Sequence, residues 1–164
     1  MSELPKCCSC CGACFRLDQI DMSRVSNLKF YCADENTLAV VFVIEGIAYY
    51  MYSYDCGVSW VGPFEALKVS GTIKSIQILT HKEQFVVAIT TMDQGKAALK
   101  SCAGRMGQNE KDFTVRECNG ASFKGDLIDV TLCVRNKPDG TPETVDIKYS
   151  LDNGRICLTC CGHG

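Results

Sequence analysis

Runs of β-branched and aromatic residues with a two-residue period dominate the chain, and this pattern predicts β-strands. The most apolar run covers residues 38–44, a turn at Glu45 and Gly46 follows, and residues 47–54 form the returning strand. The same pattern predicts further strands over residues 72–80, 84–91, 112–118, 127–134, 144–150 and 155–160. A helical turn is predicted only at residues 97–103. We therefore expect an all-β protein of antiparallel sheets, folded as one domain over residues 1–164.

Polar segments with turn-forming residues separate these strands. Residues 81–83 join two of them in a hairpin. Residues 135–143 form a longer polar loop that contains the sequence Lys-Pro-Asp-Gly at residues 137–140. This tetrapeptide predicts a tight turn, because proline fixes the φ angle of one turn position and glycine adopts positive φ at another.

Three turns share the pattern Ser/Thr-x-Asp-x-Gly. The fullest copy covers residues 53–60, with the sequence SYDCGVSW, and shorter copies cover residues 91–95 and 150–154. The aspartate of such a turn accepts hydrogen bonds from nearby backbone amides, and the glycine takes the positive-φ position. Each copy follows a predicted strand, so the three turns predict repeats of one antiparallel unit.

Residues 53–60 resemble a full Asp-box, the S-x-D-x-G-x-[ST]-W motif of the bacterial neuraminidase repeats in sialidase-type β-propellers. In the two shorter copies, Ala98 and Cys157 stand where the first copy has Trp60. The resemblance implies that the boxes are structural and lie on the hairpin between the last two strands of a blade, away from the active site. The structural residues that it implies are Ser53, Asp55, Gly57, Trp60, Asp93, Gly95, Asp152 and Gly154.

The length of the chain limits the size of such a propeller. A blade takes about 40–50 residues and closed propellers have about 4–8 blades, so 164 residues supply three or four blades. Three arrangements are open: a very small propeller closed by its termini, two copies that complete one ring, or Asp-box turns on a different β-sheet fold. The expected fold is a small or partial β-propeller of antiparallel sheets.

The thirteen cysteines are the most unusual feature of the composition. Five lie within residues 7–14 and three within residues 157–161, so both ends of the chain, residues 1–15 and 157–164, are rich in cysteine. A C-x2-C spacing lets a tight turn aim two sulfurs at one ion, and four such ligands bind zinc. We therefore expect a structural zinc site that joins the two ends, with ligands from Cys8, Cys11, Cys14, Cys157, Cys160 and Cys161.

Two other interpretations of the terminal cysteines stay open: disordered reactive tails, and disulfides between the two clusters in an oxidising environment. An odd number of cysteines excludes complete pairing within one chain. The five scattered cysteines are expected to be small buried apolar side chains without chemistry. They are Cys32, Cys56, Cys102, Cys118 and Cys133.

Charge and hydropathy exclude several classes of function. A formal net charge of −2 and a pI near 5.7 argue against a general nucleic-acid-binding protein, which would carry a basic excess. The longest apolar run, residues 38–44, is too short to span a membrane. No apolar signal region precedes the first cysteines, which indicates a cytoplasmic location or a place in a virus particle.

Two features suggest ligand binding. Residues 15–18 are similar to the F/Y-R-I/L-P motif of sialidases, and that resemblance implies that Arg16 holds a sialic-acid carboxylate, although Asp18 replaces the proline. Alternation places Tyr50, Tyr52 and Tyr54 on one face of a strand, where they form either a ligand-binding row or, as the apolar neighbouring strand favours, part of the core.

The sequence as a whole favours a non-catalytic binding or structural protein with a structural zinc ion. Its partner would be another protein or a second copy of the chain, and a glycan is a further candidate. A sialidase-like glycoside hydrolase and a thiol-rich metal-handling or redox protein are the alternatives.

Overall fold

The computed structural model describes residues 17, 20–34, 36–118, 120–124, 127–140, 142–151 and 154–162. These residues form an all-β structure of three antiparallel sheets, and none of the sheets closes into a barrel. This confirms the fold class expected from the sequence, and the arrangement is consistent with a small or partial β-propeller. In the described part of the chain, every helix is too short and too polar to cross a bilayer.

Sheet 1 is a four-stranded meander that begins after a short 3₁₀ helix, η1 (Met22–Arg24). Its strands, in spatial and chain order, are β1 (Val25–Cys32), β2 (Leu38–Ile44), β3 (Ile47–Ser53) and β4 (Val61–Lys68). The predicted strand over residues 38–44 is confirmed, and its turn at Glu45 and Gly46 has the two positive φ angles, 51° and 78°, of a tight hairpin.

Sheet 2 lies next in the chain and has five strands. They are β5 (Thr72–His81), β6 (Gln84–Asp93), β7 (Lys96–Arg105), β8 (Thr114–Glu117) and β9 (Ala121–Lys124). Both β8 and β9 pair with β7, at Cys102–Arg105 and Ala97–Leu99 respectively, so together they act as a broken fourth strand. The 3₁₀ helix η2 (Glu110–Asp112) leads into β8.

The helical turn predicted at residues 97–103 is wrong, because these residues lie inside β7. Alanine, leucine and lysine favour helices, but β7 pairs with β6 along its whole length. Ala97, Leu99 and Ala103 are buried on one face, and Cys102 is buried on the other. Tertiary pairing therefore overrides the local helical preference.

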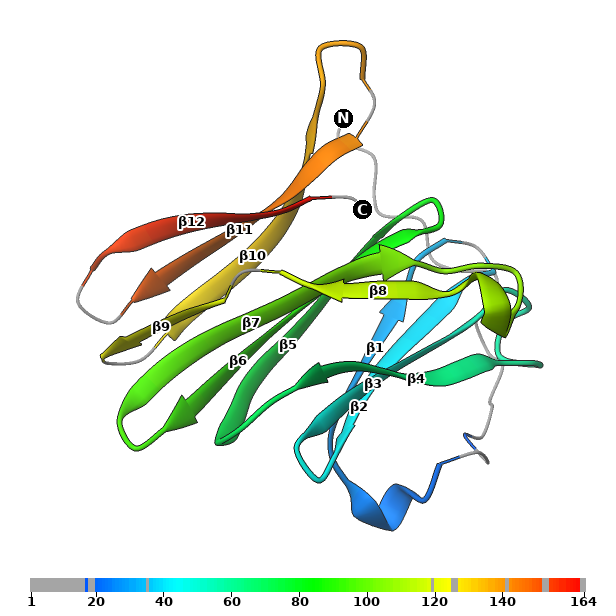
Figure 1. Cartoon of the computed structure of the whole chain (residues 1–164), viewed down its shortest axis with the longest axis horizontal. Helices are drawn as coiled ribbons and strands as arrows, with labels where there is room; N and C mark the ends of the chain where they lie inside the picture. The colour runs from blue at the N-terminus through cyan, green and yellow to red at the C-terminus, as the bar shows by residue number, and fades with distance from the viewer. Residues whose placement is uncertain are drawn as a thin grey trace, which may run out of the picture.

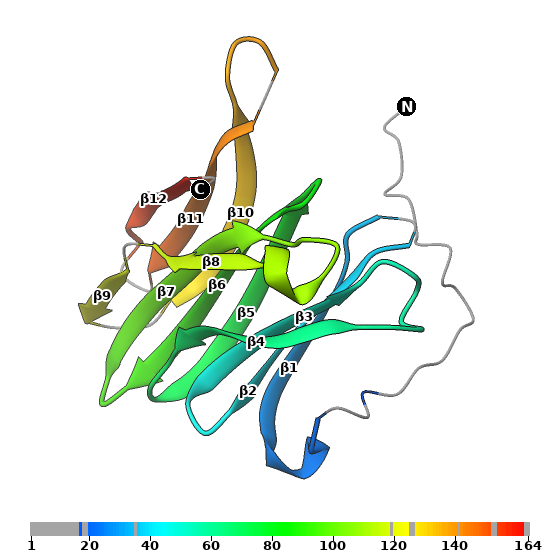
Figure 2. The same cartoon turned by 45° about the vertical axis from the view of Figure 1, so that its right-hand side comes forward.

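Sheet 3 contains β10 (Leu127–Asn136), β11 (Pro142–Leu151) and β12 (Ile156–Gly162). The turn predicted at residues 137–140 is confirmed by a hydrogen bond of 2.8 Å from the Gly140 amide to the Lys137 carbonyl. The long β10–β11 hairpin projects from the rest of the molecule (Figures 1 and 2).

The three sheets stack side by side in chain order, as Figures 1 and 2 show. One core cluster lies between sheets 1 and 2, and a second lies between sheets 2 and 3. The first strands of the sheets adjoin, since β1 contacts β5 and β5 contacts β10. This arrangement is consistent with part of a β-propeller, in which successive four-stranded antiparallel sheets lie around a central channel.

The two outer faces of the stack differ in character. On sheet 1, Val40, Phe42 and Met51 are buried under Leu17 and Ile20 from the segment before η1. On sheet 3, the outward-facing residues Asp129, Thr131 and Lys148 of β10 and β11 are exposed, and β12 places Ile156 and Leu158 opposite Ser150 and Lys148. The outer face of β10 and β11 is therefore polar, unlike the covered apolar outer face of sheet 1.

Candidate functional site

The main candidate site is a hollow of about 500 Å³ at one end of sheet 2, which we call the rim groove. Side chains from four neighbouring segments meet there: the β5–β6 turn, the end of β7, the loop that follows it and the η2–β8 segment. The residues that line the rim groove are Glu83, Arg105, Gly107, Gln108, Asp112 and Thr114.

Two glycines let the segment after β7 fold back closely enough to form this groove. A Cβ atom at Gly104 would lie 2.0 Å from the Thr114 carbonyl oxygen, and one at Gly107 would lie 2.0 Å from the Asp112 Cβ. The side chain of Asn109 caps η2 by accepting a hydrogen bond of 3.0 Å from the Lys111 amide. The backbone of this wall is therefore closely fixed.

Three tyrosine hydroxyls bind residues 106 and 107, the segment that follows β7 at the rim groove. Tyr52 donates to the Gly107 carbonyl at 2.8 Å, Tyr54 donates to the Met106 carbonyl at 3.0 Å, and Tyr50 contacts the Met106 Sδ at 3.0 Å. Burial raises the pKa of both Tyr52 and Tyr54 to about 12. The two hydroxyls accordingly stay protonated and act as donors at neutral pH.

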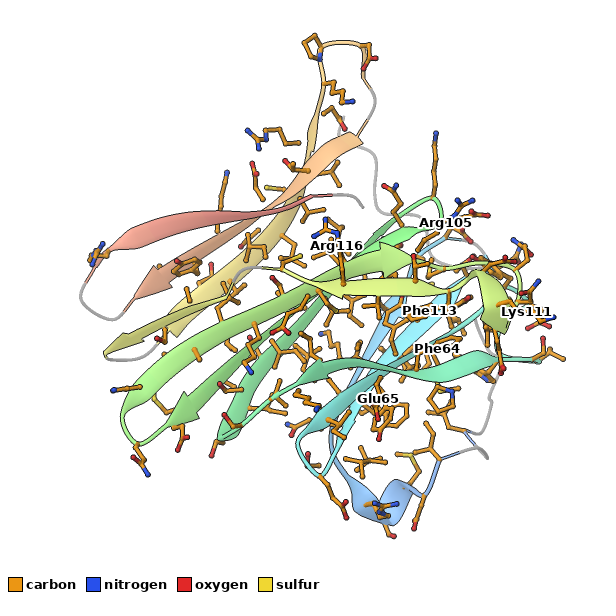
Figure 3. The ribbon with its side chains drawn as sticks, viewed as in Figure 1. Phe64, Glu65, Arg105, Lys111, Phe113 and Arg116 are labelled. Carbon is orange, nitrogen blue, oxygen red and sulfur yellow. The ribbon has the colours of Figure 1, made fainter. Side chains whose placement is uncertain are left out.

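These tyrosines belong to a cluster of stacked rings between sheets 1 and 2. The ring centroids of Tyr50 and Phe85 are 4.2 Å apart, and those of Phe64 and Phe113 are 3.9 Å apart. Figure 3 shows Phe64 and Phe113 together between β4 and β8, with Arg105 and Lys111 toward the η2 end of the molecule. We call Tyr50, Tyr52, Tyr54, Phe64, Phe85 and Phe113 the aromatic cluster.

An ion pair fixes the main cation of the rim groove. The Arg105 guanidinium donates to Glu83 Oε2 from Nη2 at 2.7 Å and from Nε at 3.0 Å. This hydrogen bonding raises the pKa of Arg105, and 61% of its side chain stays exposed. Asp112 adds a second carboxylate to the lining, so the groove offers fixed donors and acceptors side by side.

A second hollow of about 480 Å³ lies between the end of β4 and sheet 2. Lys68, Lys100 and Glu117 are among its lining residues. The Lys100 ammonium donates to the Lys68 carbonyl at 2.9 Å and thereby links the two sheets. Because the ammonium group of Lys100 already makes this contact between the sheets, the second hollow is the weaker candidate for a ligand-binding site.

The tyrosine row is part of the core and does not form a ligand surface. Tyr50 and Tyr52, named from the sequence as candidate ligand-binding residues, are both 0% exposed. Their rings pack inside the aromatic cluster, and their hydroxyls are engaged by residues 106 and 107. The core interpretation of the row is the one that the burial supports. Arg16 lies outside the described residues.

The terminal cysteine site can be compared with the structure only at β12. Residues 157–161 lie in this extended strand, which pairs with β11 from Ser150 to Thr144. The strand predicted over residues 155–160 is thereby confirmed, and Cys157 and Cys160 do not lie in a tight turn. The side chains of the six predicted ligands lie outside the described residues. Within the described part, no group of three metal-binding side chains comes together. Zinc binding stays a prediction.

The first Ser-x-Asp-x-Gly turn is held by its own side chains. Asp55 accepts hydrogen bonds from the Ser59 amide at 2.9 Å, from the Ser59 hydroxyl and from the Ser53 hydroxyl. Ser53 Oγ in turn accepts from the Gly57 amide at 2.8 Å. These bonds lower the pKa of Asp55 to about 2, with the Ser59 hydroxyl contributing most. The turn joins the third and fourth strands of sheet 1.

The second turn has the same pattern but a different structure. Gln94 and Gly95, with φ angles of 50° and 77°, form a two-residue hairpin turn between the second and third strands of sheet 2. Asp93 is exposed, and no hydrogen bond to its carboxylate occurs among the described residues. At the third turn Gly154 has a φ of 88°, while Asp152 lies outside the described residues.

The scattered cysteines are not uniform. Cys102 fits the expectation of a buried apolar side chain, and burial raises the pKa of its thiol to about 12. Cys32 is exposed. Cys56 and Cys118 are disulfide-bonded, so the expectation that these five residues carry no chemistry is wrong for two of them.

The residues of the rim groove were not singled out as a site from the sequence. Glu83 and Arg105 are 22 positions apart and meet because β6 and β7 pair with Gln84 opposite Arg105. The sequence predicts β6 but not β7, so it indicates neither this hairpin nor its register, and no motif marks Asp112.

Comparison with known proteins gives no relative: no family model, no curated protein and no solved structure matches the chain.

Proposed function

We propose that this protein is a non-catalytic binding module, built as a partial β-propeller, that takes a glycan in the rim groove. One observation carries the proposal: the groove holds a fixed guanidinium, two carboxylates and an amide side chain within a hollow of about 500 Å³. Binding sites of this size use a few well-placed polar groups to set ligand orientation.

The chemistry of the lining suits a sugar. Arg105, Gln108 and Asp112 present planar donors and acceptors, which can pair with neighbouring hydroxyl groups. The Glu83 ion pair holds the guanidinium in place before a ligand arrives, which reduces the entropy lost on binding. The closely packed backbone of residues 104–114 fixes the opposite wall in the same way.

In this proposal, the turn at residues 53–60 is a structural Asp-box. Support comes from its internal hydrogen bonds and from its place between the last two strands of a four-stranded sheet. Its role is to fix the end of β3, the strand that carries Tyr50 and Tyr52 beneath the rim groove.

A glycan array followed by titration tests the proposal. The wild-type protein should bind a defined subset of glycans, and Arg105→Ala should weaken that binding at least about tenfold, the value of one charge-assisted hydrogen bond. Arg24→Ala is the matched control, because Arg24 forms a comparable exposed ion pair with Glu45 at 3.1 Å outside the groove.

Thermal unfolding of both variants shows whether they fold as the wild type does. An array without any bound glycan would contradict the proposal, and so would equal binding by the wild type and Arg105→Ala.

A further inference from the structure

Two disulfide-bonded cysteines lie on opposite sides of sheet 2. Cys56 follows β3 of sheet 1, whereas Cys118 packs in the cluster between sheets 2 and 3. A disulfide requires its two Cα atoms to lie within about 7 Å, so the intervening sheet excludes a bond between these two residues. The scattered cysteines Cys32, Cys102 and Cys133 carry thiols. The partners of Cys56 and Cys118 therefore come from the cysteine-rich ends of the chain.

The surroundings of Cys118 point to the C-terminal strand. The Cys118 amide donates to the Ser101 carbonyl of β7 at 2.8 Å, and Cys118 packs in one cluster with Val145 and Tyr149 of β11. β12 places Cys161 opposite Val145 and Cys157 opposite Tyr149, and β12 also contacts β7. β12 is thus the cysteine-bearing strand beside Cys118.

The surroundings of Cys56 point to the N-terminal cluster. Cys56 lies in the turn that ends at Trp60, and Trp60 packs in one cluster with Leu17 and Ile20. Cys14 precedes Leu17 by three residues, a distance that an extended chain spans in about 10 Å. The segment that carries the first five cysteines therefore leaves the described structure close to this turn.

We propose that two separate disulfides fasten the two ends of the chain: Cys56 bonds to a cysteine of residues 7–14, and Cys118 bonds to Cys157 or Cys161. Each bond forms when two thiols lose two protons and two electrons to a disulfide oxidant, such as oxidised glutathione, which is reduced to two thiols. The first bond ties the N-terminal segment to sheet 1, and the second ties the edge strand β12 to sheet 2.

This connectivity differs from a zinc site shared by both ends. Each disulfide removes one cysteine from a terminal cluster, and the two bonds lie on different sheets. Disulfides of this kind are typical of proteins from oxidising environments. The proposal therefore favours an oxidising environment over the cytoplasmic location expected from the sequence.

Peptide mapping tests the connectivity directly. Protein purified without reductant is unfolded, alkylated with iodoacetamide and digested with trypsin, and linked peptides are identified by mass spectrometry. The terminal cysteines fall in the peptides of residues 7–16 and 156–164, and the inner ones in those of residues 30–68 and 117–124. We expect residues 30–68 linked to 7–16, and residues 117–124 linked to 156–164.

Variants separate the two bonds. Cys118→Ser should abolish only the link to residues 156–164, and Cys56→Ser only the link to residues 7–16. Cys133→Ser, which replaces a thiol of sheet 3, is the matched control and should leave both links intact. The opposite pairing of peptides would overturn the proposal. Recovery of alkylated Cys56 and Cys118 from the wild type would overturn it as well, and bound zinc in that sample would favour the shared metal site.

Discussion

At the residue scale, two aspartates that occupy the same place in the Ser/Thr-x-Asp-x-Gly pattern have different roles. Asp55 accepts hydrogen bonds from Ser53 and Ser59 and organises a wide turn. Asp93 begins a two-residue turn whose geometry comes from Gln94 and Gly95 alone. The difference follows from the serine four positions after Asp55, since Ala97 occupies the same place after Asp93. The short Ser/Thr-x-Asp-x-Gly pattern therefore predicts a turn but not its internal hydrogen bonds.

Asp55→Ala should lower the free energy of unfolding by about 1 kcal/mol, because the Ser59 amide and two hydroxyls lose their acceptor at a partly solvated turn. Asp93→Ala is the matched control and should change the free energy of unfolding by less than about 0.5 kcal/mol, as substitutions at other exposed sites do. Urea unfolding of the three proteins measures both values. Equal losses in the two variants would contradict the assigned role of Asp55.

The contribution of Asp55 should depend on pH. Its pKa in the folded protein is lowered from 3.8 to about 2, so the ionised carboxylate stabilises the folded state above pH 3.8. This contribution is lost as the pH falls from 3.8 through 2. The melting temperature of the wild type should therefore approach that of Asp55→Asn across this window. A constant difference between pH 5 and pH 2 would show that the hydrogen bonds do not favour the ionised form.

At the scale of elements, sequence patterns predict strands well where both faces are buried. Residues 38–44 and 47–53 lie between two apolar clusters, so their apolar character marks them clearly. β1 was missed because most of its side chains are exposed, and β4 was missed because it contains Gly62 and Pro63. β1 forms because it pairs with β2, and β4 forms because it pairs with β3. Such pairing between strands cannot be recognised from the local sequence pattern.

The same limit applies to the candidate site. Glu83 and Arg105 depend on the register of β6 and β7, and Asp112 depends on the return of the chain over two glycines. Sequence analysis could recognise the glycines but not the contacts that require them.

Gly104→Ala should strongly destabilise the junction of β7 and β8. The added methyl group would meet the Thr114 carbonyl at 2.0 Å and the Phe85 ring at 2.8 Å, and such overpacking costs about 1–3 kcal/mol or more. Urea unfolding gives the loss in free energy. Gly140→Ala has open space around its Cβ, so only the strain of its positive φ, about 1 kcal/mol, should appear. A smaller loss at Gly104 than at Gly140 would contradict the close packing of this junction.

At the scale of the whole molecule, the three sheets form an open stack with two unlike ends. The aromatic cluster joins sheets 1 and 2, and the apolar cluster around Val145 and Ile147 joins sheets 2 and 3. The outer face of β10 and β11 in sheet 3 is polar, whereas the outer face of sheet 1 is covered by Leu17 and Ile20.

The packing of sheet 1 on sheet 2 is the central claim, because the hydroxyls of Tyr52 and Tyr54 bind the backbone of the segment that lines the rim groove. Nuclear Overhauser spectroscopy of the aromatic protons tests it most directly. The structure predicts cross-peaks between the rings of Tyr50 and Phe85, 4.2 Å apart, and between those of Phe64 and Phe113, 3.9 Å apart. Each pair joins sheet 1 to residues of sheet 2 or of the segment entering β8. The absence of both sets of cross-peaks in the folded protein would contradict the stacked arrangement and the site built on it.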